Sequence, residues 1–150
     1  MALASTTIAT AIKNLSITGV TVLDITEMQD QVDLRLGPVL MPGPSWIAGG
    51  LGGEDPEGSA TFGPGMWIFQ RVFSYRYFHA PVGSGRGLYD YYSAMSTNLD
   101  AIVTAFVGLN VTGVDVMELD NSEFMVVNDP SEKQFYGFDF AVSLKEKVNP

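Results

Sequence analysis

The chain of 150 residues contains no cysteine and a single histidine, His79. The absence of cysteine excludes disulfides and thiolate metal sites, and a metal site would have to be built from carboxylates alone. Only eight residues are basic against 17 acidic ones, which gives a net charge of −9. Because so few scattered cations cannot track a phosphate backbone, we expect no sequence-specific nucleic-acid binding.

Long hydrophobic runs are also missing. The sequence has no stretch of about 18 apolar residues, so we predict no transmembrane helix and no membrane partner. Its start lacks a basic opening and an unbroken apolar segment, which is not typical of a signal peptide. Hydrophobic residues nevertheless make up 46% of the chain, enough for a sizeable core. We therefore predict a single domain over residues 1–150.

Hydrophobic periodicity predicts two helices. Residues 5–15 carry Ile8, Ile12 and Leu15 at helical spacing, and Ser5 can cap this short helix. A longer helix is predicted over 88–107, with an apolar stripe formed by Leu88, Tyr91, Tyr92, Met95, Leu99, Ile102, Val103 and Phe106.

The remaining apolar segments predict strands over residues 20–25, 32–41, 66–79, 114–119, 124–128 and 134–146. The last one alternates most cleanly, because Tyr136 to Leu144 place large apolar side chains on one face and polar ones on the other. We predict an α+β fold, in which a mainly antiparallel sheet packs against one long helix and a short N-terminal helix.

A glycine- and proline-rich segment interrupts this pattern at residues 42–65. It holds eight of the 16 glycines and four of the eight prolines, yet it also carries Trp46, Ile47, Leu51 and Phe62. Fixing its backbone costs roughly 24–48 kcal/mol, whereas burying four large side chains returns only about 6–12 kcal/mol. We therefore predict a projecting loop that is mobile in the free monomer or is ordered by a neighbour, with these four residues as contacts.

The loop at 80–87 contains Gly83-Ser84-Gly85-Arg86-Gly87 before the long helix. The helix start has Leu88-Tyr89 where a phosphate-binding loop needs Lys-Ser or Lys-Thr, so a phosphate site is not supported. We predict instead that Arg86 is presented to a protein partner, since arginine is enriched at interfaces.

Four acidic residues recur every third position: Asp24, Glu27, Asp30 and Asp33. The pattern is compatible with a solvated loop, with a cation site, or with a negative rim beside a channel through which DNA slides without binding. The calcium-loop pattern with its central glycine is absent. We keep the channel or rim as the hypothesis to test.

Chemical signals for catalysis are weak. His79 could serve as a pH-tuned base, but a packing role at a strand end is the simpler interpretation. A Ser-His-Asp triad could draw on Ser74 or Ser84 with His79 and Asp90, but the sequence lacks the spacing of a nucleophile elbow. We assign no catalytic, cofactor-binding or metal-binding residue, and we predict that the protein is not an enzyme. A small-molecule pocket between the long helix and the aromatic strand stays an alternative.

Taken together, the chain resembles the tail terminator (tail completion) proteins of long-tailed bacteriophages. The resemblance is carried by the N-terminal helix, the glycine-rich segment, and patterns at Arg35–Pro42, Phe78–Arg86, Tyr91-Tyr92, Asn128-Asp129-Pro130 and Phe135-Tyr136-Gly137.

This resemblance implies a structural virion protein without catalysis or cofactor. Such proteins form a ring, typically a hexamer, that caps the tail tube and receives the head–tail connector, and they are assembled in the host cytoplasm. Expected partners are further copies of the chain, the tail tube protein and connector proteins, with DNA passing through the lumen. A tail tube subunit or a head–tail connector (neck) protein is the alternative.

Overall fold

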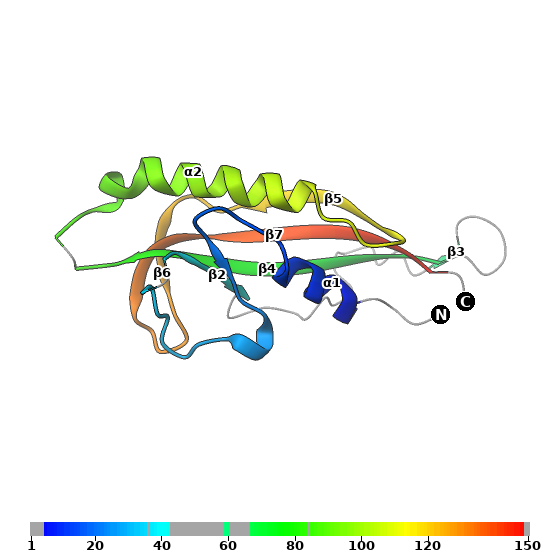
Figure 1. The fold of residues 1–150 in the computed structure, drawn as a ribbon, viewed down its shortest axis with the longest axis horizontal. Coiled ribbons are helices and arrows are strands. Elements are labelled where there is room, and N and C mark those ends of the chain that lie inside the picture. The colour runs from blue at the N-terminus through cyan, green and yellow to red at the C-terminus, as the bar shows by residue number, and fades with distance from the viewer. Residues whose placement is uncertain (1–4, 36, 43–58, 61–66, 84, 149–150) are drawn as a thin grey trace.

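The computed structural model describes residues 5–35, 37–42, 59–60, 67–83 and 85–148 (Figure 1). Within them the fold is α+β, with one seven-stranded sheet that is mixed but mostly antiparallel. This confirms the predicted fold class.

Two strands of 15 residues form the spine of the sheet. β4 (Trp67–Pro81) and β7 (Gln134–Val148) pair antiparallel along nearly their whole length. β5 (Val114–Asn121) and β6 (Met125–Asn128) both pair with β7.

Three short strands lie on the other side of the spine. β2 (Val39–Pro42) and β3 (Ser59–Ala60) both pair antiparallel with β4. β1 (Thr21–Val22) pairs with β2 in the parallel sense, which is why the sheet is mixed. The strand order is therefore β1-β2-β4-β7-β5.

The main core lies between the sheet and the helices α1 (Ser5–Lys13) and α2 (Leu88–Val107). α2 runs along the length of the two long strands (Figure 1). Alternation along β4 and β7 sends every second side chain to this side. The fully buried contributors include Ile8, Ile12, Phe73, Tyr77, Met95, Ile102, Phe106, Phe138, Val142 and Leu144.

A second, smaller cluster involves residues between β1 and β2 and side chains from β2, β4, β6 and β7. Its buried members are Val32, Val39, Met41, Phe78, Val127 and Phe135. The buried Asp129 carboxylate fastens this region, because it accepts hydrogen bonds from the Val32 and Lys133 backbone N–H groups and the Ser131 hydroxyl. Burial alone would raise the pKa of Asp129, but these hydrogen bonds together hold the pKa below its usual value.

Three predicted segments differ most from the structure. The segment 20–25 is a strand only at Thr21–Val22 and continues as the 3₁₀-helix η1 (Ile25–Glu27). In the segment 32–41 a strand begins only at Val39, because Gly37 at φ 102° turns the chain just before it. The predicted loop 42–65 is also shortened, since Pro42 ends β2 and Ser59–Ala60 form β3.

Candidate assembly surfaces

A groove of about 620 Å³ lies between the first three turns of α2 and the connection from β5 to β6. Two tyrosines of α2 dominate its rim, with Tyr89 92% exposed and Tyr92 58% exposed. We call this the aromatic groove; it is lined by Leu88, Tyr89, Tyr92, Ser96, Leu99, Asn121, Ser122, Glu123 and Phe124. Large exposed aromatic side chains beside a hollow are typical of protein–protein contact surfaces.

The helix wall of the groove follows from helical periodicity. Leu88, Tyr92 and Leu99 lie on the same apolar stripe as Met95, Ile102 and Phe106, which are buried in the core, and Leu88 and Leu99 pack against that core while partly exposed. The start of α2 is fixed because the Asp90 carboxylate accepts a hydrogen bond of 2.7 Å from the Gly87 N–H. An acidic side chain at this position also interacts favourably with the helix dipole.

The opposite wall is held by aromatic stacking and by paired hydrogen bonds. The Phe124 ring stacks on Phe138 with centroids 5.4 Å apart and also meets Tyr92 at 5.4 Å. The Ser122 N–H donates to the Asp139 carbonyl oxygen, and the Asp139 N–H donates to the Ser122 hydroxyl, each at 2.8 Å. Both walls of the groove are therefore anchored to the core.

A partly buried polar network holds the middle of α2 on the sheet. The Asn98 amide donates to the Tyr77 hydroxyl at 2.7 Å, and that hydroxyl lies 2.6 Å from His79 Nδ1. Burial raises the pKa of Tyr77 to about 12, although the hydrogen bond from Asn98 acts in the opposite direction. Burial also lowers the pKa of His79. The members satisfy one another, which favours the packing interpretation of His79 over a catalytic one.

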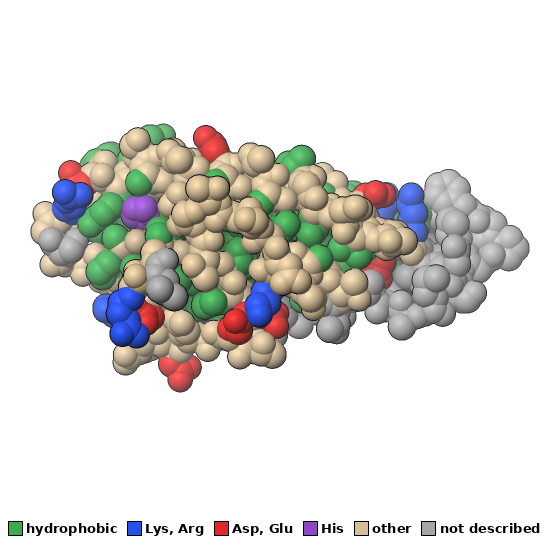
Figure 2. All heavy atoms as spheres, viewed as in Figure 1, with side chains coloured by type: hydrophobic (Ala, Val, Ile, Leu, Met, Phe, Trp, Pro, Cys, Tyr) green, Lys and Arg blue, Asp and Glu red, His purple; other side chains and the backbone are tan. Residues whose placement is uncertain are grey.

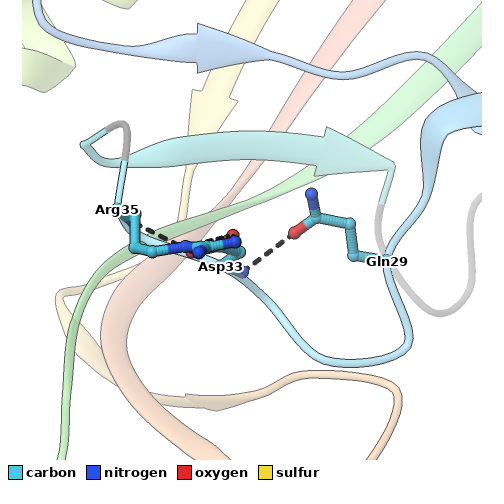
Figure 3. A network of polar contacts seen from close by, with 3 residues as sticks. All are labelled: Gln29, Asp33 and Arg35. Atoms are coloured by element: carbon cyan, nitrogen blue, oxygen red, sulfur yellow. Dashed lines mark hydrogen bonds and ion pairs between the residues drawn. The ribbon is translucent and has the colours of Figure 1, made fainter.

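The structure pairs two of the four periodic acidic residues with cations. The Glu27 carboxylate accepts a hydrogen bond from the Asp24 N–H and lies 3.1 Å from Lys13 Nζ. The hydrogen bond from Asp24 is the main cause that lowers the pKa of Glu27, and the contact with Lys13 adds to it. Asp33 binds the Arg35 guanidinium through Nε and Nη2 and donates its own N–H to the Gln29 side chain (Figure 3). The hydrogen bonds from Arg35 lower the pKa of Asp33.

The carboxylates of the other two periodic acidic residues form no ion pair with the described residues. Asp30 is exposed, and half-buried Asp24 accepts a hydrogen bond from the Thr26 hydroxyl. The strip that the spacing suggested is therefore partly neutralised rather than uniformly negative.

Sequence reasoning missed a different acidic surface along β5. Glu118, Asp120 and Glu123 are exposed at this edge of the sheet and form no ion pair with the described residues. The signal was present in the acidic residues Asp115, Glu118 and Asp120 of this segment, but only the strand order shows that the segment forms an edge. Charged side chains on an edge strand also oppose unwanted strand pairing.

Most of the basic residues are in ion pairs. On the face in view, hydrophobic side chains spread through the middle of the molecule, while charged ones lie mainly toward its ends and lower edge (Figure 2). Five of the eight basic residues are in ion pairs, including the buried pair of Arg71 Nε and Glu146 Oε1 at 2.9 Å.

The remaining predicted contact residues divide into two groups. Arg86 is exposed and makes no hydrogen bond or ion pair with any residue that the structure describes. Trp46, Ile47, Leu51 and Phe62 lie outside the described residues.

The described residues offer no cluster of three or more His, Asp or Glu side chains that could hold a metal ion. Nor does any helix among them have the length and apolarity needed to cross a membrane. No protein-family model matches the chain, and no curated protein matches it.

Proposed function

We propose that this protein is a ring-forming structural component of a bacteriophage tail, a tail terminator that caps the tail tube and joins it to the head connector. The observation that carries the proposal is the aromatic groove, with Tyr89 and Tyr92 held exposed above anchored walls. Exposing two tyrosines at one site is costly in a free monomer, and a neighbouring subunit that covers them recovers this free energy.

The architecture is consistent with this role. Both helices contact the same side of the sheet, and the resemblance noted in the sequence implies a subunit with one flat sheet face and projecting loops. In this proposal the glycine-rich segment of residues 42–65 acts as an arm that contacts a neighbour. The protein is located in the virion and has no catalytic activity.

The proposed mechanism is geometric. One ring face matches the last ring of the tube and stops further stacking, while the other face binds the connector. Arg86 projects from the loop before α2 and is a candidate contact to either partner. A net charge of −9 per copy, with the acidic edge of β5 and the Asp24–Asp33 region as candidates for the lumen or rim, would let DNA pass without adhering.

The test is the mass of the purified full chain by multi-angle light scattering, together with electron micrographs. We expect closed rings of a fixed mass. Deleting residues 45–62 should leave a folded monomer, with an unchanged circular dichroism spectrum, that no longer forms rings.

Other outcomes point to other functions. Filaments that grow with concentration would favour a tail tube subunit, because an open heterologous contact repeats without closing. A monomer at every concentration would refute a ring. Rings that persist after the deletion would refute the role of the arm.

A further inference from the structure

We propose that the aromatic groove binds residues 46–51 of a neighbouring copy of this chain. The inference rests on the proposed ring and identifies which surfaces join its subunits. It makes each contact head-to-tail, with the glycine-rich segment of one subunit seated between α2 and the β5–β6 connection of the next.

The chemistry of the groove selects an uncharged apolar peptide. Its floor and rim are formed by Leu88, Leu99, Phe124 and the two tyrosines, and its one charged side chain is Glu123. In a chain of net charge −9, a second acidic segment would be repelled there. Residues 43–53 carry no charge and contain Trp46, Ile47 and Leu51. Aromatic and aliphatic anchors of this kind supply most of the free energy in protein interfaces.

The position of the groove makes it hard for residues 46–51 to reach the groove of their own subunit. The groove lies at the level of Phe138, which is paired with Tyr77, whereas the chain re-enters the sheet at Ser59, paired with Ile68. Nine residues of strand separate these levels, a distance of about 30 Å. Leu51 precedes Ser59 by eight residues, which span at most about 26–29 Å when fully extended.

The distance from the other end of the segment, where the chain leaves β2 at Pro42, leads to the same conclusion. Trp46 follows Pro42 by four residues, so it reaches at most about 14 Å from β2. β2 and β5 are separated by three strand spacings, which is also about 14 Å before the height of the groove is included. The segment would need a fully taut chain to fill its own groove.

The groove and the re-entry point lie at opposite ends of the molecule. β3 is at the right of Figure 1, and the first turns of α2 are at the left. Head-to-tail association brings such opposite ends together, and the ring closes when the rotation per subunit allows it.

Single thiols provide the test, because the natural chain has no cysteine. One tagged copy carries Ser45→Cys beside Trp46, and a differently tagged copy carries Ser96→Cys in the groove. The two are co-expressed, purified as full chains and treated with a mild oxidant or a short bis-maleimide. The matched control replaces Ser96→Cys with Ala94→Cys, which is exposed on the opposite side of the same helix.

We expect a covalent heterodimer carrying both tags. Its yield should exceed that of the Ala94→Cys control by about tenfold, since only a bound segment raises the local thiol concentration. In addition, Tyr92→Ala should weaken ring assembly by about tenfold or more in Kd, as for other aromatic anchors.

The contrary results are distinct. Rings of full mass with equal cross-linking at Ser96→Cys and Ala94→Cys would overturn this inference and leave the proposed function standing. Internal cross-linking in a single copy that carries both Ser45→Cys and Ser96→Cys, without heterodimer, would place the segment on its own groove and also overturn it. A monomeric mass without heterodimer would refute both.

Discussion

Replacing Gly137 by alanine should destabilise the protein more than any other single methyl addition at a described glycine. Gly137 faces Phe78 in the pairing of β4 with β7, next to the irregularity between Phe78 and Ala80. A Cβ atom added there would lie far inside van der Waals contact of the Tyr77 carbonyl oxygen, and would also crowd its carbonyl carbon and the Val127 side chain.

The magnitude follows from what must move. The atoms in the way belong to the backbone of a central strand, so no rotamer change can relieve the contact, and the two spine strands must separate locally. Overpacking of this kind costs about 1–3 kcal/mol and occasionally more. For a chain of this size, 3 kcal/mol corresponds to a lowering of Tm by roughly 6–12 °C.

The assay is urea unfolding followed by circular dichroism, with thermal melts alongside. Gly108→Ala is the matched control, because Gly108 has φ −83° and its added methyl would make only ordinary contacts. We expect this control to be neutral or to stabilise by about 0.4–1 kcal/mol. Equal stability of Gly137→Ala and the natural chain would show that the close approach of β4 and β7 at this position is incorrect.

Two further predictions concern the buried Arg71–Glu146 pair and the partly buried His79. Glu146→Ala should lower the free energy of unfolding by about 3–5 kcal/mol, because Arg71, which is 4% exposed, loses the carboxylate beside it. The double variant Arg71→Met with Glu146→Leu should restore the free energy of unfolding, and urea unfolding that finds the double variant less stable than Glu146→Ala would contradict this reasoning. Because burial lowers the pKa of His79 in the folded state, the unfolded chain binds more protons, so stability should be full above pH of about 6.5 and decline as the pH falls toward the lower folded pKa. Thermal melts across this window should show the decline in the natural chain and a smaller one in His79→Gln, and parallel curves would refute it.

Much of the fold could be predicted because its pattern is local. The stripe from Leu88 to Phe106 has helical periodicity over five turns, and the two long strands alternate over more than a dozen residues. Their side-chain spacing alone specifies the element and its buried face. The short elements escaped prediction because their form depends on distant partners. β3 has two residues and exists through pairing with Ile68 and Trp67.

The candidate site shows the same division. Leu88, Tyr92 and Leu99 were predicted to share the apolar stripe of the long helix, but the structure leaves Tyr92 at the rim of a groove. Tyr92 contacts Phe124, which comes from another part of the chain, so the helical pattern alone could not reveal the groove. Likewise, the spacing of Glu27 and Asp33 could not show that Lys13 and Arg35 neutralise them.

The sequence by itself determined the class of fold, the identity of the helix and strands that make the core, and, through its missing cysteines, the absence of disulfides and thiolate sites. Those properties depend on composition and on periodicity along the chain. Only the tertiary structure decided the strand order, the acidic edge of β5, and the groove between α2 and the β5–β6 connection. Each of these depends on which residues far apart in the chain are brought side by side, and that is settled by packing and strand pairing rather than by local preference.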